Sequence, residues 1–270
     1  MKLPIITLLT DFGYRDHYVA SMKGVILSIA PETIIVDISH GVPKQDILAA
    51  AYVLKSSYRY FPPGTIHVAV VDPGVGTNRR SIVLKTRNYV FVGPDNGVLA
   101  LSAFEDGIEE ARLIENRNLF RPDVSYTFHG RDIYAPVAAH IARGVPLSAV
   151  GPILEEEIHT PVFMEPQVRH GFMECKVFYV DDFGNVVLNA TKRHLEAAGF
   201  KYGMSCSVTL KNQQTLAVRL LQSYGYSSEG EPLLLINSEG YLELAVNKGD
   251  AAKRFELAPN DSITVRLNSL

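Results

Sequence analysis

Three short apolar runs, separated by two stretches with helical periodicity, constrain the fold of this chain more than any other feature. The runs are residues 4–10 (PIITLLT), 33–37 (TIIVD) and 65–71 (TIHVAVV), and they are rich in the β-branched residues that favour strands. The first helical stretch repeats its apolar residues every three or four positions, at Val19, Met22, Val25, Ile26 and Ile29. A second helix is predicted from about Gln45 to Tyr58. Strands that alternate with helices form βαβ units, so this half is predicted to be an α/β domain with a mostly parallel sheet.

The second half of the chain has a different pattern. Its short β-rich segments are separated by Gly, Asn and Asp, and they are residues 175–180, 206–210, 232–237, 241–246 and 262–267. Such a series is typical of a small antiparallel sheet or barrel. A connector rich in Pro and Glu precedes it. We therefore predict an α/β N-terminal domain at 1–150, a linker at 151–170 and an all-β, barrel-like C-terminal domain at 171–270.

The composition is that of an ordinary soluble protein, with neither a nucleic-acid-binding nor a membrane character. Of the 270 residues 47% are hydrophobic, and the net charge of −3 leaves no basic excess for a nucleic-acid partner. The first apolar run is too short to span a membrane, and no small-residue cleavage site follows it. Cys175 and Cys206 lie in no zinc-binding pattern. We therefore expect reduced core thiols, no metal site and a cytoplasmic location.

Carboxylates follow two of the predicted strands. Asp11 ends the first run and Asp72 ends the third, so both are expected at one edge of the sheet, where ligands of open α/β sheets bind. Each acid could instead be a turn residue. After Asp72, Gly74 and Gly76 allow close backbone approach, but the pattern of a phosphate-binding loop is missing.

Two arginines and a histidine extend this set. Arg79 and Arg80 stand seven and eight residues after Asp72, and either could form a surface ion pair or set the charge of a carboxylate in a partly closed site. His129, in TFHGRD, precedes a predicted helix from about Tyr134 to Arg143. Asp16 stands where an N-cap or first-turn acid of the first helix belongs.

Two polar loops stand out in the second half. VDDFGNVVLN contains Asp181 and Asn185, and NSEG contains Ser238 and Glu239. Judged locally, both are turns between strands, and the hairpin interpretation is favoured for the first.

Taken together, six motifs resemble one family. TDFG, DPGVGT-x-R, GPDNG, FHGRD-x-(Y/F)-AP, D-x-FGN and NS-x-G-x-LE-x-AVN occur in this order between about residues 4 and 250. The chain thereby resembles the S-adenosylmethionine (SAM) hydroxide adenosyltransferases, which are related to fluorinating and chlorinating enzymes. The resemblance implies hydrolysis of SAM to adenosine and L-methionine, with hydroxide attacking the ribose 5′ carbon in line and no cofactor.

The resemblance also implies roles for single residues. The catalytic Asp-Arg-His set of the family falls on Asp72, Arg79 and His129, and Arg79 is preferred to Arg80 because of its seven-residue spacing from the acid. The halogenating relatives typically have Tyr where this chain has Asp72, which favours water over halide as the nucleophile.

The remaining implied residues bind the substrate. Asp11 is implied to bind the ribose hydroxyls and Asp16 the methionine ammonium group. Asp181 and Asn185 match positions that hold the methionine and adenine parts, and Ser238 with Glu239 matches methionine-carboxylate and backbone contacts. A homotrimer with sites between subunits is also implied. Two alternatives stay open: a halide adenosyltransferase, and a sensor that binds SAM or adenosine without turnover.

Overall fold

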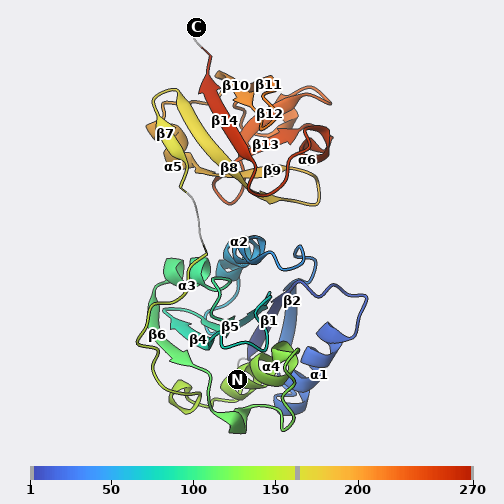
Figure 1. Cartoon of the computed structure of the whole chain (residues 1–270), viewed down its shortest axis with the longest axis vertical. Helices are drawn as coiled ribbons and strands as arrows, with labels where there is room; N and C mark the ends of the chain where they lie inside the picture. The colour runs from blue at the N-terminus through green and yellow to red at the C-terminus, as the bar shows by residue number, and fades with distance from the viewer. Residues whose placement is uncertain (1–2, 162–164, 269–270) are drawn as a thin grey trace. The chain divides into compact units, whose positions relative to one another are not determined.

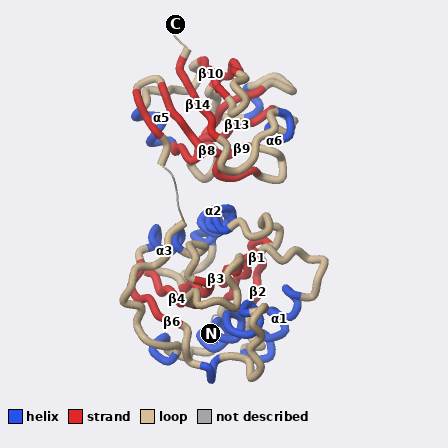
Figure 2. Tube along the Cα trace, viewed as in Figure 1, coloured by secondary structure: helices blue, strands red, loops and turns tan. Residues whose placement is uncertain are grey.

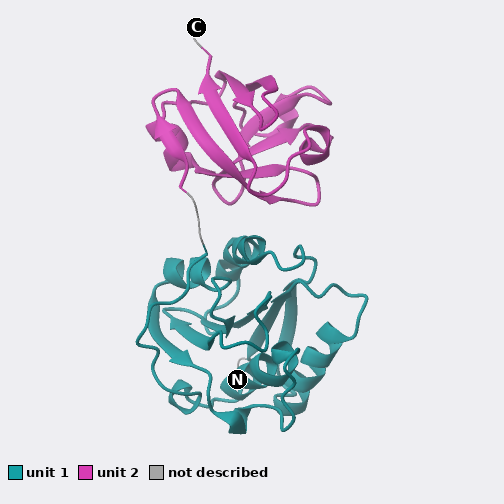
Figure 3. Cartoon of the chain, viewed as in Figure 1, with its two compact units in different colours: residues 1–162 teal, residues 163–270 magenta. Residues whose placement is uncertain are grey.

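The computed structural model describes residues 3–161 and 165–268, which form two compact units. Unit 1 comprises residues 1–162 and unit 2 comprises residues 163–270, shown in teal and magenta in Figure 3. None of the helices in the described ranges has the length and apolar character that a membrane crossing requires.

Unit 1 is built on a six-stranded sheet with helices on both faces. Its strands are β1 (Ile5–Thr10), β2 (Ile34–Ser39), β3 (Ile66–Val70), β4 (Ser81–Thr86), β5 (Val90–Pro94) and β6 (Ile108–Leu113). Its α-helices are α1 (Tyr18–Ile29), α2 (Ile47–Ser57), α3 (Ala100–Asp106) and α4 (Ala135–Ala142). Figures 1 and 2 show α1 and α4 on one side of the sheet and α2 and α3 on the other.

The sheet is mixed, so the expectation of a mostly parallel sheet is not confirmed. In the strand order β2-β1-β3-β5-β4-β6, the first four strands run parallel, as the βαβ pattern predicts. β4 pairs antiparallel with β5 and with β6. Only residues 87–89 connect β4 to β5, and so short a connection permits only an antiparallel hairpin.

The helices of unit 1 follow the apolar periodicity, but the N-terminus of α1 differs from expectation. Val19, Met22, Val25 and Ile26 are buried in α1, as predicted. The N-cap of α1 is His17 and its first turn holds no acid, so the prediction that Asp16 caps this helix is wrong. In α2 the side chain of Asp46 caps the helix by accepting a hydrogen bond from the Ala49 N–H.

Unit 2 is an antiparallel sheet that nearly closes into a barrel. Its strands are β7 (Gln167–Arg169), β8 (Phe172–Val180), β9 (Val186–Thr191), β10 (Ser205–Thr209), β11 (Thr215–Arg219), β12 (Pro232–Ile236), β13 (Tyr241–Val246) and β14 (Ser262–Leu267), with the short helices α5 (Lys192–Ala197) and α6 (Ala251–Arg254). The order is β11-β10-β14-β8-β9-β13-β12, and a bridge between Leu220 and Leu234 joins the two ends. Cys175 and Cys206 are buried in the barrel core as free thiols, as expected.

The segment that follows α4 lies partly along unit 1. Ile153 forms an isolated bridge with Arg112 of β6, and the His159 N–H donates to Asp95 Oδ1 at 2.8 Å. The chain therefore adds to the antiparallel edge of the first sheet before it reaches unit 2.

Candidate active site

The two acids that follow strands lie at the same edge of the sheet in unit 1. β1 and β3 are parallel neighbours, and Thr10 at the end of β1 is in register with Val70 at the end of β3. Asp11 and Asp72 therefore both follow the carboxyl ends of adjacent strands, where a ligand of this kind of sheet is expected.

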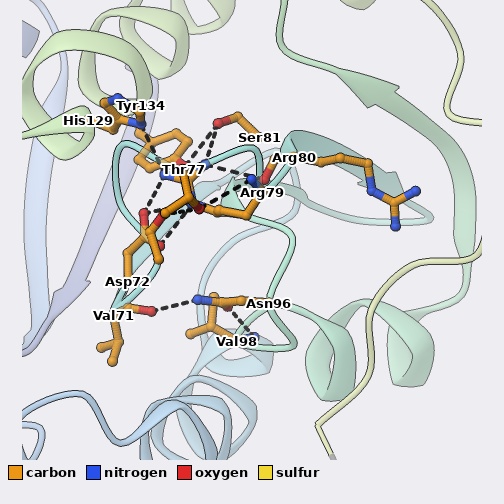
Figure 4. A network of polar contacts seen from close by, with 11 residues as sticks. Val71, Asp72, Thr77, Arg79, Arg80, Ser81, Asn96, Val98, His129 and Tyr134 are labelled. Atoms are coloured by element: carbon orange, nitrogen blue, oxygen red, sulfur yellow. Dashed lines mark hydrogen bonds and ion pairs between the residues drawn. The ribbon is translucent and has the colours of Figure 1, made fainter. Parts of the chain in front are cut away.

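Asp72, Arg79 and His129 form one contact network, shown in Figure 4. Arg79 Nε lies 2.9 Å from each carboxylate oxygen of Asp72, and Nη2 also donates to Oδ2. The same Nη2 lies 3.0 Å from His129 Nδ1. The Asp72 and Arg79 side chains are only 5% and 12% exposed, so this ion pair is shielded from bulk water. A bidentate ion pair of this kind holds the carboxylate in a fixed orientation relative to the guanidinium group.

Two further side chains hold the arginine, and neither was predicted from the sequence. Arg79 Nη1 donates to Ser81 Oγ at 2.7 Å, and Ser81 Oγ lies 3.0 Å from the hydroxyl of Tyr134. The Arg79 guanidinium also lies over the Tyr134 ring, 5.6 Å from its centroid. Burial raises the pKa of Tyr134, which keeps the phenol neutral. Tyr134 occupies the (Y/F) position of the FHGRD motif, which was the available signal.

Arg80 points away from this network (Figure 4). Its Nε donates to Asp95 Oδ2 at 2.7 Å, and its Nη2 donates to the carbonyl of Glu157 at 2.7 Å. The two arginines thus pair with different carboxylates, Arg79 with Asp72 and Arg80 with Asp95. The arginine that faces Asp72 is therefore Arg79.

His129 is held in its neutral form. Burial and the positive charge of Arg79 lower its pKa, and the charges of Asp72 and Asp132 offset this only in part. Because Arg79 donates to Nδ1, the neutral ring carries its proton on Nε2. His129 directly precedes a π-helical turn, Gly130–Tyr134, and such turns are frequent at functional sites.

A cavity of about 660 Å³ opens beside His129 in unit 1. Thr77, Arg117, Ser125 and Tyr126 are among the residues that line it. Gly76, which we expected to allow close approach of a ligand, also lines this cavity, and its backbone packs closely against that of Tyr126. A Cβ at Gly76 would lie 2.2 Å from the Tyr126 carbonyl oxygen.

Asp11 is buried and held by the turn that precedes α2. Its Oδ2 accepts the Gln45 N–H at 2.8 Å, and the Lys44 ammonium donates to its carbonyl. Gln45 adopts a left-handed backbone conformation with φ of 64°. Asp16 is exposed on the loop between β1 and α1.

The predicted residues of unit 2 lie in two turns. Asp181 Oδ1 accepts the N–H groups of Phe183 at 3.0 Å and Asn185 at 2.8 Å, and Oδ2 accepts the Asn185 amide at 2.9 Å. Asp181 thus fixes the orientation of Asn185. Ser238 is exposed in the turn between β12 and β13, where its hydroxyl lies 3.3 Å from the Glu239 carboxylate.

Asp181 and Asn185 share the wall of a second cavity, also of about 660 Å³ and within unit 2. The other lining residues are Phe183, Tyr224, Val246, Lys248, Gly249 and Asp250. Gly184 lets the loop approach Asp250, since its φ is +80° and a Cβ there would lie 2.1 Å from Asp250 Oδ1. Across both units, the described residues contain no group of three or more His, Cys, Asp or Glu side chains arranged to hold a metal ion.

Comparison with known proteins identifies relatives over nearly the whole chain. Residues 6–151 match the model of the SAM hydroxide adenosyltransferase N-terminal domain, and residues 175–264 match that of the C-terminal domain. A protein of Salinispora tropica named (R)-S-adenosyl-L-methionine hydrolase is 39% identical over 265 residues, 97% of each chain. A fluorinase of Actinoplanes sp. is 30% identical over 290 residues, again 97% of each chain.

A solved structure is similar to the chain as well. It is that of an uncharacterized conserved protein from Thermotoga maritima, with a TM-score of 0.91 and 39% sequence identity. The match covers 97% of this chain and 99% of that one.

Proposed function

The chain belongs to the SAM hydroxide adenosyltransferase family, and from that premise we propose how its residues hydrolyse SAM to adenosine and L-methionine. The chain is a SAM hydrolase, and Asp72, Arg79 and His129 act on the attacking water. The observation that carries this assignment is the shielded Asp72 carboxylate, fixed by Arg79 at the ligand-binding edge of the sheet.

The chemistry requires alignment and one proton acceptor. The water oxygen forms a bond to the ribose 5′ carbon while the bond from that carbon to sulfur breaks. The electron pair of that bond stays on the methionine sulfur, and the water loses one proton. The sulfonium is already a good leaving group, so orientation supplies much of the acceleration; well-oriented reactants gain about 7–11 kcal/mol.

Asp72 is the proposed group that orients the water and takes its proton. Free water has a pKa of about 15.7, so an acceptor at the moment of attack lowers the barrier. Arg79 occupies one side of both Asp72 oxygens and thereby fixes the direction of the remaining lone pairs. The neutral His129 accepts a hydrogen bond from Arg79 at Nδ1 and offers its Nε2–H as a hydrogen-bond donor to the oxygen of the water.

The same carboxylate favours water over halide. A halide ion has no proton to give to Asp72, and two like charges about 4 Å apart repel by about 1 kcal/mol in water and about 4 kcal/mol near a protein surface. Because the chain also has fluorinase relatives, a halide adenosyltransferase is the alternative, and its halogenated product can be sought in the same assay.

The substrate contacts are proposed from the family resemblance and from the position of each residue. Asp11 binds the ribose hydroxyls, since its carboxylate follows the strand next to that of Asp72. Asp16 meets the methionine ammonium group. In unit 2, Asp181 with Asn185 binds the methionine and adenine parts, and Ser238 with Glu239 binds near the methionine carboxylate.

The setting of the enzyme is proposed on the same basis. We infer that it works without a cofactor, in the cytoplasm and as a homotrimer. Light scattering of the purified protein measures the oligomeric state directly, and a mass of one chain would contradict the trimer.

The deciding experiment is hydrolysis in water enriched in ¹⁸O. Wild-type protein is incubated with SAM in chloride buffer, the products are separated, and their masses are determined by mass spectrometry. We expect adenosine labelled at the 5′ oxygen together with methionine, and loss of both in Asp72→Asn. Asp95→Asn is the matched control, because it removes the charge of another shielded carboxylate, the one that pairs with Arg80.

Other products would point elsewhere. A 5′-chlorinated nucleoside would identify a halide adenosyltransferase. Intact SAM that stays bound to the protein would favour the sensor. Unlabelled adenosine would exclude attack of water at the 5′ carbon.

A further inference from the structure

Strand β13 of unit 2 carries a buried carboxylate, that of Glu243. Glu243 is 3% exposed and pairs across the sheet with Leu235 of β12 on one side and with Val187 of β9 on the other. Its neighbours Leu242 and Leu244 point into the barrel core. Alternation along the strand therefore places Glu243 on the opposite face, between apolar side chains.

The first polar partner of Glu243 belongs to the wall of the unit 2 cavity. The Tyr224 hydroxyl donates to Glu243 Oε1 at 2.7 Å. Tyr224 lines that cavity together with Asp181 and Asn185. Glu243 does not reach the cavity itself, so it acts on the cavity through Tyr224.

The second polar partner organises the neighbouring turn. Asn237 Oδ1 accepts the N–H groups of Glu239 and Tyr241, each at 3.0 Å. Its side chain is also hydrogen-bonded to Glu243. Since the amide oxygen already accepts from the backbone, the amide nitrogen donates to the carboxylate. Glu243 therefore connects Tyr224 to the turn that carries Ser238.

Stability alone does not account for a carboxylate at this position. Burial raises the pKa of Glu243, and the nearby charge of Asp181 raises it further, although the hydrogen bonds of Tyr224 and Asn237 oppose this. A buried carboxyl group carries a desolvation cost that its hydrogen bonds offset only in part, and an apolar residue would avoid that cost. With Leu235 and Val187 beside it, a leucine would fit the apolar surroundings at position 243.

We propose that Glu243 is a positioning residue for SAM binding in unit 2. It holds Tyr224 in the cavity wall and, through Asn237, holds the turn that presents Ser238. This inference rests on the proposed function, because it assumes that the cavity and the turn receive parts of SAM. Glu243 lies outside the set of residues that act on the water, so we expect it to affect SAM binding and not the chemical step.

The test compares the steady-state kinetics of Glu243→Leu, Tyr224→Phe and the double variant. In Glu243→Leu we expect the KM for SAM to rise by a factor on the order of ten, which corresponds to two lost hydrogen bonds. We expect kcat to change by less than about twofold and the melting temperature to fall only slightly, since the cost of burying the carboxyl group disappears together with its hydrogen bonds. Glu243→Gln should recover part of the affinity, because its amide oxygen still accepts from Tyr224.

The double variant shows whether Glu243 acts through Tyr224. If it does, the effects of the two substitutions on the KM are not additive, and the double variant has the same KM as Glu243→Leu. Glu174→Leu is the control, since it makes the same change at an exposed position of β8. A wild-type KM in Glu243→Leu would overturn the proposal. So would a fall in kcat and melting temperature together, or fully additive effects.

Failure of the proposed function is visible separately. If wild-type protein binds SAM without hydrolysing it, the dissociation constant from calorimetry replaces KM in the same comparison. Tenfold weaker binding of SAM by Glu243→Leu then still supports the positioning role, while unchanged binding overturns it. If wild-type protein does not bind SAM, both proposals are overturned.

Discussion

The pair of Asp72 and Arg79 allows a quantitative prediction about stability. Arg79→Met removes the cation and leaves the 5%-exposed Asp72 carboxylate without its partner. Breaking a buried pair from one side costs about 3–5 kcal/mol, because a desolvated charge stays behind. For a unit of this size 1 kcal/mol shifts the melting temperature by about 2–4 °C, so the transition of unit 1 should fall by about 6–20 °C.

The double variant separates the stranded charge from the other contacts of Arg79. Asp72→Asn combined with Arg79→Met removes the charge that the single change exposes, so we expect it to be more stable than Arg79→Met by about 1–3 kcal/mol. Scanning calorimetry at pH 7 measures the stability of both variants. Equal or lower stability of the double variant would refute the view that desolvation of Asp72 causes the loss. The lost contacts to Ser81 and His129 would then be the main cause.

Three further predictions concern His129, Gln45 and the two cysteines. Because burial and Arg79 lower the pKa of His129, kcat should be constant above its ordinary pKa of 6.5 and fall only at lower pH, where the ring gains a proton; this acid limb should be missing in the residual activity of His129→Asn. Gln45 has a left-handed backbone conformation, which glycine adopts easily and valine does not. In urea titrations the free energy of unfolding of Gln45→Gly should therefore lie within about 1 kcal/mol of the wild-type value, whereas that of Gln45→Val should be lower by about 1–2 kcal/mol. Burial raises the pKa of Cys175 to about 12 and of Cys206 to about 11, so neither thiol should react with a thiol reagent at pH 8 until urea unfolds the protein.

Local chemistry was sufficient to single out the two acids that follow strands, whereas their contact partners came from the family resemblance or from the structure. Asp11 and Asp72 stand out because a buried strand that stops at a carboxylate is visible in the residue order. The choice between Arg79 and Arg80 depends on which side of the chain faces the sheet edge, and a difference of one residue reverses that side. Ser81 and Tyr134 contact each other from 53 positions apart, and no local pattern encodes such a contact.

For Asp16, a local pattern led to a wrong prediction. An acid just before a helical pattern usually caps the helix, but α1 begins after His17, one residue later than the pattern suggests. The side chain of Asp16 is thereby left exposed on the loop, where the resemblance places the methionine ammonium group.

The sequence by itself determined the features that depend on neighbouring residues. Periodicities of about 3.6 and 2 distinguish helices from strands, and the change between the two halves reveals an α/β unit followed by a β unit. Tertiary structure decided the rest. It paired β6 antiparallel with β4, joined the two ends of the second sheet through the bridge between Leu220 and Leu234, and brought His129 to Arg79 from 50 positions away. The physical reason is that these outcomes depend on which surfaces pack together, and packing joins residues whose separation along the chain carries no periodic signal.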